Sequence, residues 1–161
     1  MLVELRFACF IIYFFLFQIV VWEIYESDLL RAALLNQIAK LAASLYAFFG
    51  KQPLLTDNIL SHLDNGRYLI INPSCSGVQM TATLIAGLLA FRCKKLYYYI
   101  LTIIAVQVLN QLRIVHLFSL IHDDWDRFNF YHLYVWQIFN FIFACSFFST
   151  LLRYKCKHDS I

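Results

Sequence analysis

Long apolar runs, rather than a two-residue alternation, dominate the hydrophobic pattern of this chain. A helix needs about 20 mostly apolar residues to cross a hydrocarbon core, and four stretches approach this length. They cover residues 7–22, 77–91, 96–114 and 133–152. Helices satisfy their backbone hydrogen bonds internally, as lipid requires. The pattern therefore predicts about four transmembrane helices in a single membrane domain over residues 1–161.

Residues 29–49 have a different pattern, with apolar positions every three or four residues and polar positions on another face. The apolar positions are Leu30, Leu34, Ile38, Leu41, Leu45 and Phe48, and the polar ones are Asn36, Lys40 and Ser44. This pattern is typical of an amphipathic helix that lies in the membrane interface. A fifth transmembrane helix, packed by its polar stripe, is the alternative.

Beyond Gly50 the chain becomes polar and β-prone. Asn65-Gly66 lies between short apolar segments, which is a strong hairpin signal, and predicts a small β-hairpin over residues 57–72. The expected fold class is an all-α integral membrane protein with about four transmembrane helices, one interfacial helix and a small extracytoplasmic β-hairpin.

Composition supports this class. Apolar residues make up 61% of the chain and charged residues 14%, against about 25% charged in a typical soluble domain. The net charge of +3 is small, and its basic residues are scattered, so we expect no nucleic-acid partner. Membrane lipids are the partners that the composition predicts. Five cysteines cannot all pair with one another, so at least one thiol is free.

Basic residues near helix ends predict the orientation, because they resist translocation. The turn between the second and third helices and the tail after the fourth are densely basic; they contain Arg92, Lys94 and Lys95, and Arg153, Lys155 and Lys157. Both segments should be cytoplasmic, together with the N-terminus. Residues 23–74 and about 114–131 then face out of the cytoplasm, in a multi-pass protein of the inner or plasma membrane.

Three chemically distinctive residues fall at the predicted outer helix ends. Cys75 precedes the second helix, Arg113 ends the third and His132 opens the fourth. At 1.5 Å per residue, each lies about 26 to 32 Å from a basic cytoplasmic anchor, which is about one bilayer core. We therefore expect the three side chains at one depth, on the extracytoplasmic face.

These residue types suit nucleophilic catalysis. A thiol is reactive as its thiolate, which cations and helix N-termini favour, and Ser76 and Gly77 place Cys75 at such a terminus. Ser74 or Ser76 can cap the helix, and Gly77 leaves room for a substrate near free N–H groups. His132 can transfer protons near neutral pH. Arg113 can stabilise an anionic intermediate, while Gln107, Asn110 and Gln111 form a polar wall beside it.

The motifs Pro73-Ser74-Cys75-Ser76-Gly77, Asn110-Gln111-Leu112-Arg113-Ile114 and Phe130-Tyr131-His132 occur in an order that resembles the exosortase/archaeosortase family. The chain resembles a short member, and the similarity covers most of it. The resemblance implies a membrane cysteine protease or transpeptidase that cleaves a C-terminal sorting tail through a thioester acyl-enzyme. Its substrates would be exported proteins with a C-terminal motif, a hydrophobic helix and a basic end. The catalytic residues that it implies are Cys75, Arg113 and His132, with Ser76, Gly77 and Asn110 in support and no cofactor or metal.

Several alternatives remain open. His116 is the second candidate histidine, because His132 is followed by Leu133-Tyr134-Val135-Trp136 where many relatives have a glycine. A metal site near residues 116–126 fits no common ligand spacing, and the acids there can instead cap a helix.

A non-catalytic membrane partner or assembly protein would not need Cys75, Arg113 and His132. A quinone-linked thiol oxidoreductase needs paired outer cysteines, whereas Cys9 and Cys145 lie within helices and Cys93 and Cys156 are expected to be free cytoplasmic thiols.

Overall fold

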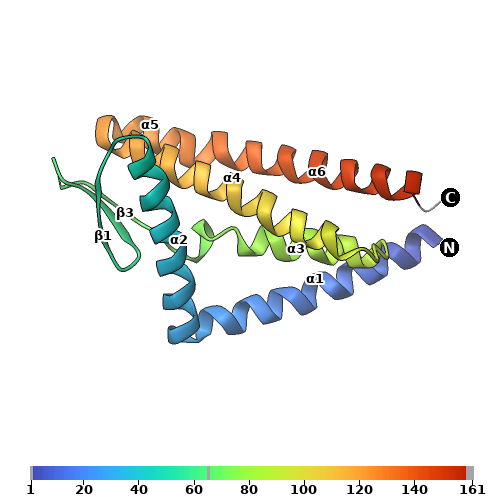
Figure 1. Cartoon of the computed structure of the whole chain (residues 1–161). Helices are drawn as coiled ribbons and strands as arrows, with labels where there is room; N and C mark the ends of the chain where they lie inside the picture. Colours follow the sequence, from blue (N-terminus) through green and yellow to red (C-terminus); the bar gives the residue numbers. More distant parts are fainter. Residues whose placement is uncertain (1, 65, 159–161) are drawn as a thin grey trace.

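Helices that run along one bundle make up most of the fold (Figure 1). The computed structural model describes residues 2–64 and 66–158, and side chains at these positions except 2, 3, 122, 123 and 154–158. The bundle contains α1 (Leu2–Glu26), α3 (Val78–Ala90), α4 (Leu96–Asp123) and α6 (Trp136–His158), with the short α5 (Trp125–Phe130) before α6. The beginning of α1 and the end of α6 lie at the same end of the bundle (Figure 1). The fold is that of the predicted all-α membrane protein with a small sheet.

Among the described helices, three are long and apolar enough to cross a membrane, and they cover Glu4–Glu26, Leu96–Ile121 and Trp125–Arg153. The shorter apolar helix α3 has 13 residues, which gives about 20 Å of helix. A hydrocarbon core is about 30 Å thick, so α3 alone does not span it. An irregular turn precedes α3, and any of its backbone polar groups that are buried need partners within the protein.

Helix α2 (Asp28–Phe48) crosses one end of the bundle instead of running along it (Figure 1). It is not among the described helices that meet the length and hydropathy requirements for a span, which favours the interfacial placement. The predicted apolar stripe divides between two surroundings: Ile38 is buried in the core, whereas Leu41 and Phe48 are exposed. The sequence pattern alone does not distinguish a face that meets protein from one that meets lipid, because both are apolar.

A three-stranded antiparallel sheet follows α2, where the sequence predicted a hairpin over 57–72. Its strands β1 (Pro53–Thr56), β2 (Ile59–His62) and β3 (Tyr68–Ile70) are ordered β1-β2-β3. Leu60 is buried and pairs with Leu55 on one side and Leu69 on the other. Asn58 fixes the exit of the sheet, because its amide donates to the carbonyl of Ile71 at 2.7 Å. This bond fixes the point at which the chain leaves the sheet, just before residue 72.

Helix α4 continues to Asp123, well beyond the predicted end at 114. Its last turns bury Phe118 and Ile121 against α2 and the sheet, in a core that includes Tyr46 and the stacked ring of His62. The segment expected as an outer connection over 114–131 is therefore largely helical, since it has this apolar surface to cover.

Several expectations concern positions that lie outside the described residues. They are Asn65 of the Asn-Gly turn and the side chains of His122, Asp123, Lys155, Cys156 and Lys157.

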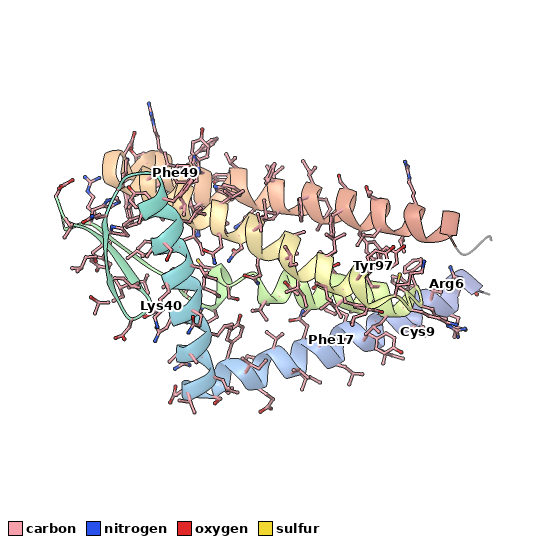
Figure 2. The ribbon with its side chains drawn as sticks, in the orientation of Figure 1. Arg6, Cys9, Phe17, Lys40, Phe49 and Tyr97 are labelled. Carbon is pink, nitrogen blue, oxygen red and sulfur yellow. The ribbon has the colours of Figure 1, made fainter. Side chains whose placement is uncertain are left out.

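Figure 2 shows the two ends of the bundle by their labelled side chains. Arg6 and Tyr97 lie at the end where α3 turns into α4, and the Arg6 guanidinium lies 5.8 Å from the ring centre of Phe91. Lys40 belongs to α2 and Phe49 follows its last residue, at the opposite end (Figure 2). The basic turn between α3 and α4 is therefore separated from α2 by the length of the bundle.

Candidate functional site

Three segments that are distant in the sequence meet at the end of the bundle opposite the beginning of α1. They are the start of α3, the C-terminal half of α4 and the segment joining α5 to α6 (Figure 1). These segments carry Cys75, Arg113 and His132. The common depth expected for the three residues is consistent with this arrangement.

Cys75 lies in a tight turn over residues 72–77, which we call the cysteine turn. It contains the 3₁₀ turn η1 (Pro73–Cys75). Asn72 caps this turn: its side-chain oxygen accepts from the Cys75 N–H at 3.2 Å and from the Ser74 hydroxyl at 2.6 Å. The Cys75 N–H also donates to the Asn72 carbonyl at 2.9 Å. The backbone at the cysteine is thus held by local bonds before any other helix contributes.

Ser76 is completely buried, and its hydroxyl has a structural role. It donates to the Pro73 carbonyl at 2.7 Å and accepts from the Val78 N–H at 3.2 Å, which caps the start of α3 as expected of Ser76. It also shares a hydrogen bond with the Tyr25 hydroxyl. One donor and two acceptor sites are all that a serine hydroxyl has, so this group is fully satisfied.

Helix α4 binds the backbone of the cysteine turn through two amides. The Asn110 side chain donates to the Cys75 carbonyl at 2.7 Å, and Gln107 donates to the Ser76 carbonyl at 3.3 Å. These bonds supply partners within the protein for the backbone carbonyls of this irregular turn. Gln111, the third member of the predicted polar wall, is buried and neither of its amide atoms has a partner within the described part of the chain.

Gly77 joins the turn to α3 with a φ of +72°, a left-handed conformation that side chains disfavour. A Cβ at this position would lie 3.2 Å from Cγ of Asn110. The sequence suggested that Gly77 leaves room for a substrate, which stays a prediction. The missing side chain allows Asn110 of α4 to approach the turn closely.

We expect Gly77→Ala to loosen the cysteine turn. The left-handed conformation costs a non-glycine residue about 1–2 kcal/mol, and the new methyl group pushes on Asn110. The melting temperature of the purified protein in detergent should fall, and the rate of Cys75 alkylation should change. Gly50→Ala is a matched control, because Gly50 also has a positive φ but nothing lies within 4 Å of its Cβ position. Equal alkylation rates in the two variants would contradict this interpretation.

A cavity of about 190 Å³ opens beside the cysteine turn, and most of its lining is polar or small. Pro73, Ser74, Gly77, Gln79, Met80, Val106, Leu109, Asn110, Arg113 and Asn140 line it. The first-turn N–H groups of a helix have no partner inside the helix, and Gln79 and Met80 contribute such groups at the start of α3. An anion placed here would meet a helix N-terminus and a guanidinium together.

Arg113 is half-buried in the wall of this cavity. Its Nε is buried and makes no hydrogen bond to any described residue. A buried donor without a partner costs about 1–3 kcal/mol, which an anionic ligand could recover. The Arg113 guanidinium also lies close enough to His132 for the two charges to interact. Of the three predicted residues, Arg113 therefore both lines the cavity and lies near His132.

His132 belongs to the π-helical turn η2 (Tyr131–Val135), between α5 and α6. π-helical turns are rare and are frequent at functional sites. The imidazole is half-buried and stacks on Phe128, with ring centres 5.5 Å apart and an interplanar angle of 10°. Asp124 caps α5 by accepting from the backbone of Asp126 and Arg127, in agreement with the expected helix-capping role of these acids.

The Cys75 side chain packs against the core formed by α2, α4 and the sheet, and neither Cys75 nor His132 is among the described residues that line the cavity. Within residues 2–64 and 66–158, no hydrogen bond joins the Cys75 thiol to a histidine. His116, the alternative histidine, accepts a hydrogen bond from the Trp136 indole at 3.0 Å. The Nδ1 atom of His116 is thereby occupied. Catalytic hydrogen bonds are often long without substrate, so the open arrangement is compatible with chemistry.

Two participants were not predicted from the sequence. Asn140 lines the cavity from α6, and Tyr25 reaches the cysteine turn from α1. The two amides within the apolar stretch of α6, Gln137 and Asn140, were a signal for a polar face on this helix. Tyr25 gave no comparable signal, because tyrosines are common near the ends of membrane helices.

The remaining described cysteines differ in their environments. Cys93, which the sequence suggested as a cytoplasmic thiol outside any disulfide, is buried at the turn between α3 and α4, and Cys145 is exposed on α6. Burial of Cys93 means that it resists a thiol reagent whichever side of the membrane it occupies. It cannot report on orientation.

Membrane helices around a capped cysteine turn, a half-buried arginine and a π-helical histidine define a multi-pass membrane protein with a cysteine-centred candidate site. The family model described as transmembrane exosortase (Exosortase_EpsH) matches residues 3–148. The chain belongs to the transmembrane exosortase family. Comparison with curated proteins gave no match, and comparison with solved structures gave none either.

Proposed function

We propose that this protein is a membrane-embedded cysteine protease or transpeptidase that removes the C-terminal sorting tail of exported proteins. One observation carries the proposal: Asn110 holds the Cys75 carbonyl, and one turn further along α4 Arg113, whose buried Nε has no partner among the described residues, lines the cavity beside that turn. Family membership supports a transpeptidase of this type.

In the proposed reaction, the Cys75 thiolate attacks a peptide carbonyl of the substrate, and His132 holds the thiol proton. The C–S bond forms as the carbonyl electrons move to oxygen. When the tetrahedral intermediate collapses, the C–N bond breaks and His132 donates its proton to the leaving amine. The tail segment departs, and the exported protein remains bound to Cys75 as a thioester.

Release reverses the proton transfers. His132 removes a proton from the acceptor, an amine or water, and the acceptor attacks the thioester carbonyl. The thiolate leaves as the C–S bond breaks, giving a new amide or a free carboxylate. Each bond that forms is matched by a bond that breaks, and no group is oxidised or reduced. The proposed reaction therefore uses no cofactor.

Arg113 and the start of α3 would stabilise the oxyanion in both steps. Preorganised donors that face developing charge in a dry site are usually the largest single contribution to such reactions. Gln79 and Met80, in the first turn of α3, line the same cavity as Arg113. Helix α2 and the sheet, which cover this end of the bundle, would guide the substrate towards the turn.

Co-expression with a reporter that ends in a motif, a hydrophobic helix and a basic tail tests the proposal. We expect a shorter reporter, and brief treatment with acid should trap a covalent adduct on Cys75 that mass spectrometry detects. A reporter that keeps its tail at full expression would favour the non-catalytic assembly role. The chemistry requires the thioester at Cys75 and at no other cysteine.

We expect both termini to be cytoplasmic and the cysteine turn to face the opposite side. In a chain whose single cysteine is Cys75, a membrane-impermeant methanethiosulfonate should label intact cells. In a cysteine-free chain carrying Lys94→Cys, labelling should require permeabilised cells, because Lys94 is exposed in the basic turn at the opposite end. Labelling of the Lys94 variant in intact cells would reverse the proposed orientation.

A further inference from the structure

The last turn of α1 contacts the cysteine turn through one side chain. The Tyr25 hydroxyl lies 3.3 Å from the Pro73 carbonyl and is hydrogen-bonded to Ser76. These partners are 48 and 51 residues away along the chain. Most of α1 exposes apolar side chains, as expected of a helix surrounded by lipid. Tyr25 therefore differs from these apolar side chains of α1, because it forms a hydrogen bond with the cysteine turn.

The Tyr25 hydroxyl bonds to two groups of the cysteine turn. It donates to the Pro73 carbonyl at 3.3 Å and shares a hydrogen bond with the Ser76 hydroxyl, in which either oxygen can be the donor. Ser76 in turn bonds to the Pro73 carbonyl at 2.7 Å and accepts from the Val78 N–H at 3.2 Å. Ser76 has no exposed surface, so bulk water cannot take the place of the tyrosine hydroxyl if that group is removed.

Tyr25 is itself held in place from α2. Arg31 donates to the Tyr25 carbonyl at 3.1 Å and forms an ion pair with Asp28. The corner between α1 and α2 and the cysteine turn are thus joined through Tyr25. Asn110 and Gln107 hold the turn from α4, on the other chain segment that contacts it.

We propose that Tyr25 is a positioning residue for Cys75, an inference that rests on the proposed function. Through Ser76 it fixes the Pro73 carbonyl and the Val78 N–H, the groups that flank Cys75 on either side. Misplacing a reacting group by about 1 Å can cost about 10²-fold in rate. Loss of one of several bonds that hold the turn should move Cys75 by less, so we expect roughly a 10-fold fall.

Tyr25→Phe removes only the hydroxyl and tests the inference in the full chain. With the tailed reporter, kcat should fall about 10-fold while KM changes little, because Tyr25 acts on the turn and not on the substrate. Tyr13→Phe is the matched control, since Tyr13 is an exposed tyrosine of the same helix, and its kinetics should equal those of the parent. A Tyr25→Phe variant as fast as the Tyr13→Phe variant would overturn the inference.

A double-mutant cycle separates positioning through Ser76 from a general loss of stability. Ser76→Ala should be at least as slow as Tyr25→Phe, and the double variant should be no slower than Ser76→Ala. Effects that multiply would show that Tyr25 acts elsewhere and would refute the inference. The conservative change Ser76→Thr, which keeps the acceptor, should retain the dependence on Tyr25.

Alkylation of Cys75 by N-ethylmaleimide, in a chain without other cysteines, gives a readout that needs no substrate. The rate and its pH profile should differ between Tyr25→Phe and the parent, and not between Tyr13→Phe and the parent. If Cys75→Ala still cleaves the reporter, the proposed function fails whatever Tyr25 does. If Cys75→Ala is inactive and Tyr25→Phe matches the parent in cleavage and alkylation, the inference about Tyr25 fails alone.

Discussion

Cys75→Ala should abolish tail cleavage, with a loss on the order of 10³-fold or more, because no other group can form the thioester. The substituted protein should still fold. The Cys75 carbonyl that binds Asn110 belongs to the backbone, and so does the N–H that binds Asn72, so both bonds survive the change. Uncleaved reporter should accumulate and co-purify with the variant. Cleavage is measured as the ratio of the two reporter lengths at equal amounts of membrane protein.

Cys145→Ala is the matched control for this experiment. Cys145 is an exposed thiol on α6 and contributes no bond to the cysteine turn. The control should process the reporter at the rate of the parent. Processing that persists in Cys75→Ala would exclude Cys75 as the nucleophile and remove the proposed mechanism.

Arg113→Gln should lower the cleavage rate by about 10²- to 10³-fold, the range for losing one donor that stabilises an oxyanion. The effect should fall mainly on kcat, because the developing charge exists in the transition state and not in the bound substrate. Arg113→Lys should recover part of the rate, since it keeps the charge but loses the planar fork of donors. Rates at saturating reporter in detergent or nanodiscs measure both changes.

Arg127→Gln provides a control at the same end of the molecule. Arg127 is largely exposed and pairs with Asp124 at 3.4 Å, away from the cavity lining. Its removal should leave the rate unchanged, and thermal stability in detergent should be similar in the Arg113 and Arg127 variants. An Arg113→Gln variant as fast as the Arg127 control would exclude the oxyanion role.

Much of the chemistry could be predicted from local sequence. Asn110 and Arg113 lie three residues apart, so one helix face had to carry both, and the structure directs both to the cysteine turn or its cavity. Ser76 and Gly77 lie at the start of α3, where the Ser76 hydroxyl accepts from the Val78 N–H and Gly77 permits the close approach of Asn110. Short-range geometry follows from residue type and spacing, which explains these agreements.

Long-range features could not be predicted in this way. The contact of Tyr25 with Ser76 joins residues 51 positions apart. The burial of Cys93 and the extension of α4 to Asp123 depend on which surfaces meet in three dimensions. The π-helical turn at His132 changes which way the histidine faces, and no periodicity in the sequence announces it.

Arg113, which the sequence predicted at a helix end, lies inside α4 (Leu96–Asp123). The amino-acid sequence by itself determined that the chain is a helical membrane protein. Apolar run length and residue spacing are local quantities, and they are sufficient for this. Only the tertiary structure decided which apolar faces meet protein, where the cavity opens, and that α1 holds the cysteine turn. Lipid and the protein interior are equally apolar, so the hydrophobicity of a side chain does not show whether it contacts lipid or protein. Hydrogen bonds between distant segments form only when the chain has folded.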